Sequence, residues 1–311
     1  MKAFATTGDP TPLTTSLTLV DVAEPAPAEH EAVIAVQAFS VNRGEALAIN
    51  GSYGTPAGAG QLLGQDVAGV VVQAAADGSG PAAGTRVVGH PAGGGWAERV
   101  AVSVDALAEV PEGVSSVIAA AVPLAGLTAL RLLKAAGDIA GKRVLLTGAS
   151  GGVGHYLVEL ALAAGARVTA VSSSAERGRR LAEFGASVVG TAAEADGAHD
   201  VIFESVGGEE FASAITKLAA GGTVLWYGQA SLAPITLDFF SLFAVTPFTL
   251  KHFPHWVSET SDAEDLATLI ALIHEGRLHP EIGTTADWAD TASVLDDVYA
   301  RRVRGNAVLT I

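Results

Sequence analysis

The stretch from Arg143 to Ser174, RVLLTGASGGVGHYLVELALAAGARVTAVSSS, decides the fold. A short apolar run, Val144 to Leu146, precedes Thr147 and a cluster of glycines. An amphipathic segment follows and stops at Gly165, before a second β-branched run from Val168 to Val171. This order predicts a strand, a glycine-rich turn, a helix and a second strand, which is the unit that binds a dinucleotide.

Physical requirements of nucleotide binding explain why glycine occurs in this turn. In the pattern G-x-G-x-x-G the first position is Ala149, and Gly151 and Gly154 occupy the other two. Glycine permits a tight turn, a close approach of the pyrophosphate to the backbone, and close packing of the helix on the strand. Free N–H groups at the start of the helix then attract the phosphates. We therefore expect this turn to bind a nucleotide.

The end of the second strand predicts which nucleotide binds. An NAD site has a carboxylate about 20 residues after the turn, to bind the ribose hydroxyls. This chain has Ser172, Ser173 and Ser174 there, followed by Glu176 and Arg177. Hydroxyls and an arginine suit a 2′-phosphate, so the sequence predicts NADPH over NADH. At least one of three nearby arginines is expected on a solvated helix face: Arg177, Arg179 and Arg180.

Composition excludes several classes of partner and site. The formal net charge is −15, and so acidic a surface repels nucleic acid and anionic lipid. The longest nearly apolar run, Val117 to Leu130, contains Pro123 and Gly126 and is too short to cross a membrane. The N-terminal residues lack the apolar core of a secretion signal, so we expect a cytoplasmic, soluble protein. The absence of cysteine excludes disulfides and thiolate-bound zinc.

The rest of the chain predicts a two-part α/β fold. Residues 1–120 contain many short strands between turns, typical of a mostly β domain, and a helical pattern runs from 115 to 136. From residue 141, strands and helices alternate, with one helix expected from 208 to 219, which predicts a doubly wound parallel sheet. Helices are expected at 262–274 and 290–302. A last strand, 307–311, should return to the N-terminal domain.

Several motifs resemble one enzyme superfamily. The turn also fits T-G-x-x-x-G-x-G of the short-chain dehydrogenases, but no tyrosine here has the lysine four residues later that they need. The chain is more similar to the zinc-free quinone oxidoreductase (zeta-crystallin-like) group of the medium-chain dehydrogenases/reductases. The motifs that carry the resemblance are Ser40–Arg43, Leu63–Gly69, Ala121–Ala129, Gly148–Gly154, Val206–Gly208 and Gly221–Gly222.

The resemblance implies an architecture. It implies a GroES-like catalytic domain, residues 1–120 with 258–311, and a Rossmann NADPH-binding domain, residues 121–257. The active site would lie in the cleft between them, and the protein would form a homodimer. Zinc-dependent members carry cysteine where this chain has Asn42, and Gly-His-Glu where it has Gly64, Gln65 and Asp66. A catalytic metal is therefore not expected.

The resemblance also implies a reaction, the transfer of hydride from NADPH to a quinone or an α,β-unsaturated carbonyl. Asn42 would hold the nicotinamide ribose or donate to the substrate oxygen, and Tyr53 would donate a hydrogen bond or a proton. Packing on the cleft is the alternative for Tyr53. Glu45 and Asp66 are expected to fix loops or pair with arginine. The expected cofactor-binding residues are Asn42, Thr128, Ser150, Gly151, Gly152, Val153, Gly154, Ser172, Ser173, Ser174, Arg177, Val206, Tyr227 and Gly228.

Two other functions share these motifs. One is an enoyl reductase dedicated to a biosynthetic pathway, which would differ only in the walls of its pocket. The other is a non-catalytic NADPH-binding protein of the crystallin kind. Turnover with a panel of acceptors distinguishes them.

Overall fold

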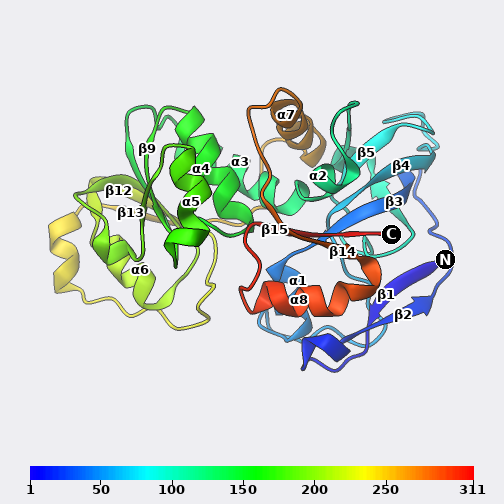
Figure 1. Ribbon diagram of the computed structural model, residues 1–311, viewed down its shortest axis with the longest axis horizontal. Coiled ribbons are helices and arrows are strands. Elements are labelled where there is room, and N and C mark those ends of the chain that lie inside the picture. The colour runs from blue at the N-terminus through cyan, green and yellow to red at the C-terminus, as the bar shows by residue number, and fades with distance from the viewer. The chain divides into compact units, whose positions relative to one another are not determined.

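The computed structural model describes residues 1–311, which form two compact units (Figure 1). The first unit contains Met1–Leu127 together with Glu259–Ile311, and the second contains Thr128–Ser258. No helix in either unit is long and apolar enough to span a membrane.

The second unit is built on a six-stranded sheet in which every pair of neighbours is parallel. The strand order is β10-β9-β8-β11-β12-β13. Successive strands are added toward one edge from β8 to β10 and toward the other edge from β11 to β13, so the order reverses between β8 and β11. This confirms the predicted doubly wound sheet. The strands are β8 (Arg143–Leu146), β9 (Arg167–Val171), β10 (Ser187–Val189), β11 (His199–Glu204), β12 (Leu218–Trp226) and β13 (Thr249–His252).

The helices of this unit connect successive strands. Right-handed crossovers place α4 (Gly152–Ala163) and α5 (Ala175–Glu183) on one face of the sheet and α6 (Gly208–Ile215) on the other. The prediction of a helix from 208 to 219 is wrong at its C-terminal end, because α6 stops at Ile215 and β12 starts at Leu218. The short 3₁₀ helices are η3 (Ala192–Glu194) and η4 (Phe240–Val245).

The first unit contains a seven-stranded, mainly antiparallel sheet. Its order is β14-β15-β3-β4-β5-β7, and β6 pairs with β3; β1 and β2 form a separate hairpin. The last strand, β15, pairs with β3, which confirms that the C-terminus returns to the N-terminal domain. The strands are β1 (Lys2–Thr6), β2 (Leu17–Asp21), β3 (Glu31–Val41), β4 (Val67–Gln73), β5 (Arg86–Gly89), β6 (Arg99–Ser103), β7 (Leu107–Glu109), β14 (Ile282–Asp287) and β15 (Asn306–Thr310).

The helical pattern at 115–136 is divided in the structure. It forms α2 (Ser116–Ala120) and α3 (Pro123–Ala136), because Pro123 cannot donate a backbone hydrogen bond within a helix and instead begins a new one. The other helices are α1 (Arg43–Ile49), α7 (Asp262–His274), α8 (Thr291–Tyr299) and the 3₁₀ turns η1 (Leu13–Thr15), η2 (Val104–Ala106) and η5 (Trp288–Asp290).

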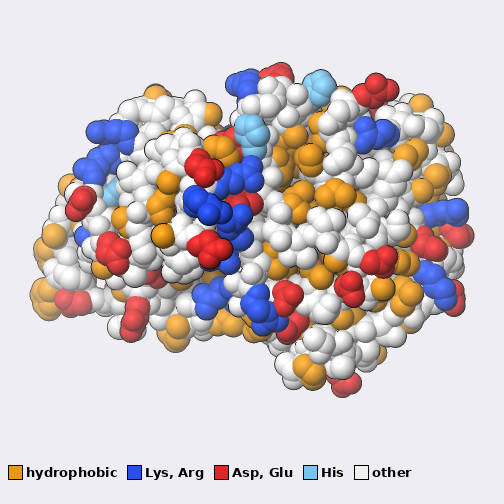
Figure 2. Space-filling model, in the orientation of Figure 1, with side chains coloured by type: hydrophobic (Ala, Val, Ile, Leu, Met, Phe, Trp, Pro, Cys, Tyr) orange, Lys and Arg blue, Asp and Glu red, His pale blue; other side chains and the backbone are white.

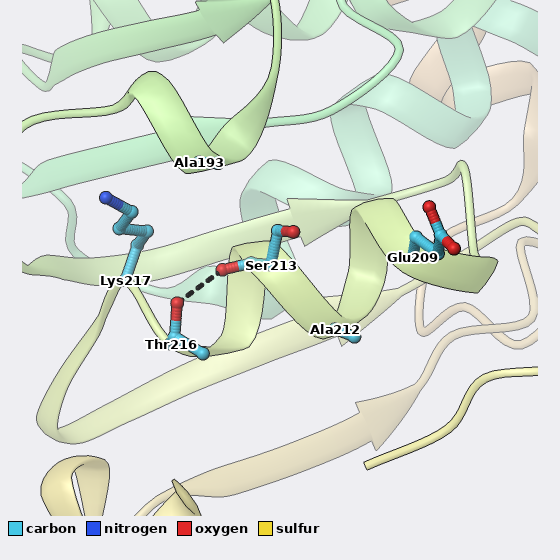
Figure 3. A pocket seen from close by; sticks show the side chains of 6 residues that line it. All are labelled: Ala193, Glu209, Ala212, Ser213, Thr216 and Lys217. Carbon is cyan, nitrogen blue, oxygen red and sulfur yellow. Dashed lines mark hydrogen bonds between the residues drawn. The ribbon is translucent and has the colours of Figure 1, made fainter. Parts of the chain in front are cut away.

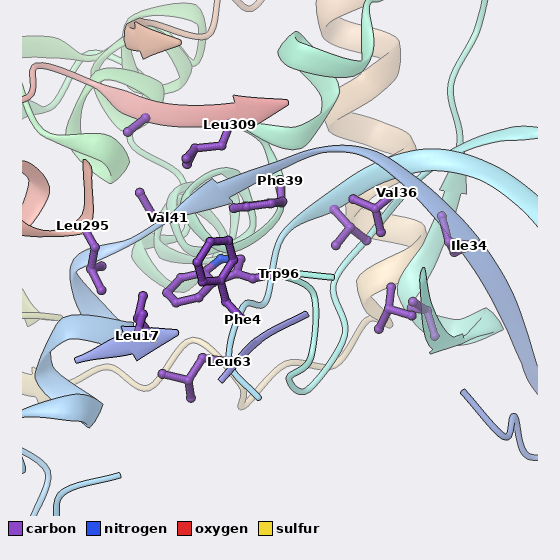
Figure 4. Packing of buried hydrophobic residues seen from close by; sticks show 14 of the residues in the cluster. Phe4, Leu17, Ile34, Val36, Phe39, Val41, Leu63, Trp96, Leu295 and Leu309 are labelled. Atoms are coloured by element: carbon purple, nitrogen blue, oxygen red, sulfur yellow. The ribbon is translucent and has the colours of Figure 1, made fainter. Parts of the chain in front are cut away.

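Large apolar side chains fill the interior of the first unit (Figure 4). Trp96 is fully buried, its ring lies 6.3 Å from Phe39, and its Nε1 donates to the carbonyl of Ser40 over 3.0 Å. Leu309 of β15 and Leu295 of α8 belong to the same core. This core fixes β3, and with it Ser40 and the loop that follows.

Candidate active site

The turn between β8 and α4 has the geometry of a phosphate cradle. Gly148 has a φ of +63°, a left-handed conformation that favours glycine. A Cβ on Gly154 would lie 2.5 Å from the Gly148 carbonyl oxygen, so only glycine fits. Gly151 is the N-cap of α4 and has its own Cβ position 3.2 Å from the same oxygen. The backbone is therefore folded tightly at this turn.

The first turn of α4 supplies donors to this cradle. The N–H groups of Gly152, Val153 and Gly154 lie in the first turn of the helix, where no carbonyl four residues earlier is available inside the helix. The helix dipole adds partial positive charge at the same end. Together these groups can bind a phosphate.

Three side chains meet beside the cradle at the end of β9. Ser172 is buried, and its Oγ donates to Ser150 Oγ over 3.1 Å. Arg177 Nε donates to the same Ser150 oxygen over 3.4 Å. Ser174 caps α5 by accepting from the backbone N–H of Arg177 over 3.2 Å, while Ser173 is exposed. The loop thus presents hydroxyls and one guanidinium together.

The neighbouring arginines point elsewhere. Figure 2 shows Lys and Arg side chains gathered over α5. Arg179 is exposed, and the guanidinium of Arg180 lies over the ring of Phe184, 5.4 Å from its centroid. Of the three arginines considered from the sequence, only Arg177 is hydrogen-bonded to Ser150.

The loops after β11 and β12 close this edge of the sheet. Val206 and Gly207 follow β11, and Tyr227 and Gly228 follow β12. A Cβ on Gly228 would lie 3.0 Å from the carbonyl oxygen of Ser205, so the two loops are in close contact. The hydroxyl of Tyr227 is buried, which raises the pKa of that group. Thr128 lies in α3 and is also buried.

In the first unit, Asn42 is held by a buried polar cluster. Its Nδ2 donates to Asp66 Oδ2 over 2.7 Å and to Ser40 Oγ over 3.2 Å, which fixes the orientation of the amide. Asp66 is fully buried and also accepts from the Ser40 hydroxyl and from the Leu124 N–H. His90 Nδ1 lies 3.4 Å from Asp66 Oδ1. Burial lowers the pKa of His90, but the hydrogen bond and charge of Asp66 outweigh this and raise it.

Glu45 lies in the same cluster, in the first turn of α1. Its Oε2 accepts from the backbone N–H of Asn42 over 2.9 Å, whereas Oε1 is buried without a hydrogen-bond partner. Burial, followed by the nearby charge of Asp66, raises the pKa of Glu45 to about 8. Hydroxyl, amide and backbone groups donate to these two carboxylates, and the imidazole of His90 lies beside Asp66. These contacts fix the loop after β3, which is one of the two roles that the sequence suggested.

Tyr53 lies on the surface of its unit. Its side chain is 71% exposed, and its hydroxyl lies 3.8 Å from the position of a Cβ on Gly44. The phenol is therefore next to the first turn of α1, which follows Asn42, and it is accessible to a substrate.

Known protein families match two parts of the chain. The alcohol dehydrogenase GroES-like domain family matches residues 28–112, and the zinc-binding dehydrogenase family matches residues 152–275. A chloroplast envelope quinone oxidoreductase homolog of Arabidopsis thaliana is 31% identical over 78% of this chain and 76% of its own length. The chain belongs to the quinone oxidoreductase group of the medium-chain dehydrogenases/reductases.

Three further similarities concern ligands, substrates and length. A solved structure of mycobacterial Rv1454c complexed with NADPH has a TM-score of 0.87 and 27% identity, and the match covers 100% of both chains. An acryloyl-coenzyme A reductase of Sulfurisphaera tokodaii is 32% identical over 62% of this chain and 58% of its own length. The chain spans only 10% of a mycocerosic acid synthase-like polyketide synthase of Mycobacterium tuberculosis, 32% identical over 68% of this chain.

One surface hollow of this chain lies away from the nucleotide turn. It runs along α6 from Glu209 to Lys217 and toward Ala193 (Figure 3). Lys217 precedes the amino end of β12, whereas doubly wound sheets bind ligands at the carboxyl ends of their strands. We therefore do not assign this hollow to the active site.

His155 and Glu204 are buried ionisable groups near the nucleotide turn for which the sequence predicted no role. His155 lies in the first turn of α4, where burial lowers its pKa to about 4, and its Nδ1 lies 3.1 Å from the carbonyl oxygen of Gly151. Glu204 ends β11 and is fully buried. The one signal available was a carboxylate at the end of an otherwise apolar strand, Val201 to Phe203.

Proposed function

We propose that this protein is an NADPH-dependent oxidoreductase that transfers hydride to a quinone or an α,β-unsaturated carbonyl without zinc. One observation carries the choice of cofactor: Ser150, Ser172 and Arg177 meet at the end of β9, where an NAD site would have a carboxylate. A guanidinium and two hydroxyls can bind a 2′-phosphate through charge-assisted hydrogen bonds. The NADPH complex of mycobacterial Rv1454c supports the same choice.

The residues present fit a dinucleotide. The open cradle of Gly148, Gly151 and Gly154 would bind the pyrophosphate, with donors from the start of α4. Bound NADPH supplies the hydride. The nicotinamide half would be held by residues after the other strands and from the first unit: Asn42, Thr128, Val206, Tyr227 and Gly228.

The donor set argues against zinc. The position that is cysteine in zinc-dependent relatives is Asn42, and its amide nitrogen is already bound to Asp66 and Ser40. Quinones and unsaturated carbonyls accept hydride as delocalised anions, so hydrogen-bond donors are sufficient to stabilise the product oxygen. Tyr53, exposed beside α1, is our candidate donor of that hydrogen bond or proton.

A pathway-specific enoyl reductase is the second candidate. The observation in its favour is the 32% identity to an acryloyl-coenzyme A reductase, whose named substrate is an unsaturated thioester. Reduction of such a thioester needs the same hydride and the same proton donor. Only the rates measured with different hydride acceptors, quinones or enoyl thioesters, distinguish such an enzyme from a quinone reductase.

The cofactor assignment is tested with two arginine variants. Arg177→Ala should lower kcat/KM for NADPH by about 10- to 100-fold, because it removes a charge-assisted hydrogen bond, and should leave kcat/KM for NADH unchanged. Arg179→Ala is the matched control: Arg179 is exposed on the same helix, so its removal should leave kcat/KM for both cofactors unchanged. An equal effect of both variants, or wild-type preference for NADH, contradicts the assignment.

We also propose a homodimer formed through β13. All four residues of this edge strand are exposed, and three exposed phenylalanines, Phe239, Phe240 and Phe243, lie on or before η4 with ring centroids 5.4–6.2 Å apart. Asp238 is the sole charged residue between Tyr227 and Leu250. Two copies of this acidic protein would therefore repel each other little if they met through this face. Light scattering should give a dimer for the wild type and a monomer for Phe240→Glu; a wild-type monomer contradicts the proposal.

A further inference from the structure

Glu204 is a buried carboxylate without a cationic partner. It is the last residue of the central strand β11 and is fully buried. Its Oε1 accepts from Thr147 Oγ1 over 3.0 Å, from the Val206 N–H over 2.8 Å and from the Gly207 N–H over 3.0 Å; Oε2 lies 3.2 Å from the same Gly207 nitrogen. All of these donors are neutral.

The electrostatics of this position are unfavourable to a carboxylate. Burial raises the pKa of Glu204, the hydrogen bonds from Gly207, Val206 and Thr147 oppose the rise, and the charge of Glu210 adds to it. A buried carboxylate costs free energy unless hydrogen bonds replace its hydration. An apolar residue at this position would continue the strand with a smaller desolvation cost. The carboxylate is therefore not needed to form the strand, and its hydrogen bonds indicate another role.

These hydrogen bonds join the loops on either side of the point where the strand order reverses. Thr147 leads into the phosphate cradle, and its Oγ1 also accepts from the Ser205 N–H over 3.0 Å. Ser205 Oγ donates back to the Thr147 carbonyl over 3.2 Å. A Cβ on Gly148 would lie 2.6 Å from Ser205 Oγ, so the two loops have no room to slide past each other.

A third loop is attached to the same group. The Ala230 N–H donates to the Ser205 carbonyl over 2.9 Å, and the Ser231 N–H donates to the Val206 carbonyl over 2.8 Å. Gly207, with a φ of +73°, gives the loop a left-handed bend that brings its N–H to Glu204. The loops after β8, β11 and β12 therefore form one assembly, with the carboxylate of Glu204 at its centre.

We propose that Glu204 is a positioning residue for the dinucleotide: as acceptor of three hydrogen bonds, its carboxylate holds the loops after β8 and β11 in the arrangement that binds NADPH. This inference rests on the proposed function. The role requires an oxygen atom at this position that accepts the three hydrogen bonds; it does not require the negative charge. Glutamine keeps one oxygen that can accept from Thr147, Val206 and Gly207, whereas alanine leaves three buried donors without a partner.

The test measures NADPH affinity by fluorescence titration and the melting temperature of the protein without cofactor. Glu204→Ala should raise the Kd for NADPH at least about 10-fold, and Glu204→Gln should restore it to within about 3-fold of the wild type. Glu210→Ala is the matched control. Glu210 Oε1 also accepts a backbone N–H, from Ala192 over 2.6 Å in the same unit, so this variant should lower the melting temperature and leave the Kd unchanged.

Two results would overturn the inference: a folded Glu204→Ala protein with wild-type affinity, or a Glu210→Ala protein that loses as much affinity. If Glu204→Ala does not fold, Thr147→Val replaces it, because it removes only the hydroxyl that bridges Glu204 and Ser205. That variant should raise the Kd by about 5-fold, and unchanged affinity contradicts the inference. Failure of the wild type to bind NADPH would instead contradict the proposed function.

Discussion

Ser172 Oγ donates a hydrogen bond to Ser150 Oγ over 3.1 Å, and this bond joins the end of β9 to the turn before α4. Both hydroxyls are buried, and Arg177 reaches the same Ser150 oxygen. In the proposed NADPH site, the group at position 172 would therefore decide the charge met by the 2′ substituent of the adenosine ribose. With serine there, an added phosphate meets donors and no carboxylate.

Ser172→Asp should reverse the cofactor preference. A carboxylate at this position repels the 2′-phosphate and can bind two ribose hydroxyls, as in NAD sites. We expect kcat/KM for NADPH to fall about 100-fold while that for NADH rises. The matched control is Ser173→Asp, whose side chain is exposed. The account of specificity is contradicted if both variants have the same NADPH-to-NADH ratio.

Tyr53→Phe tests the proton donor. Because Tyr53 is 71% exposed, the loss of its hydroxyl should leave the melting temperature unchanged. We expect kcat to fall about 10- to 100-fold with the KM for NADPH unaltered, since the hydroxyl acts only when charge develops on the substrate oxygen. Steady-state kinetics with a single enone measure this. An unchanged kcat would remove Tyr53 from the reaction and leave it a packing role.

His155 makes stability depend on pH in mild acid. Burial lowers the pKa of His155 from 6.5 to about 4, so between these values the unfolded chain binds a proton that the folded protein does not. Stability is therefore complete above about pH 6.5 and falls as the pH drops toward 4, by up to about 3 kcal/mol. Urea unfolding of His155→Gln should lose this part of the pH dependence. A variant curve parallel to the wild-type curve would contradict the assignment.

Glu45 acts in the opposite direction. Its folded pKa of about 8 lies above the ordinary 4.5, so the folded protein retains a proton that the unfolded chain releases. The stability this provides is complete below about pH 4.5 and is lost as the pH rises toward 8. Glu45→Gln removes the titration, so its melting temperature relative to wild type should increase by several degrees from pH 5 to pH 8.5. Exposed Glu29→Gln should show no such change.

The alternating half of the chain was largely predictable. A parallel sheet buries both of its faces, so its strands are short apolar runs between helices and turns. Such runs predicted β8 and β9, and their alternation with helices predicted the doubly wound sheet. The glycine turn and the serines after β9 were predictable for a different reason, because each has a local steric or electrostatic cause. What failed was the end of α6, since Leu218 and Ala219 suit either a helix or a strand.

The contacts between distant segments were not predictable. Asp66 binds the neighbouring residues Ser40 and Asn42 and also the N–H of Leu124. These three segments are far apart in sequence, and nothing in their spacing indicates this cluster. The same holds for the hydrogen bond between Glu204 and Thr147, which are 57 residues apart. Tertiary packing determines such partners, and periodicity carries no information about them.

The most direct test is oxidation of NADPH by the purified protein with a panel of quinones, linear enones and enoyl thioesters. We predict turnover with at least one of these acceptors, a clear preference for NADPH over NADH, and no loss of rate after treatment with a metal chelator. Tight binding of NADPH without turnover of any acceptor would contradict the enzymatic account and favour a non-catalytic NADPH-binding protein.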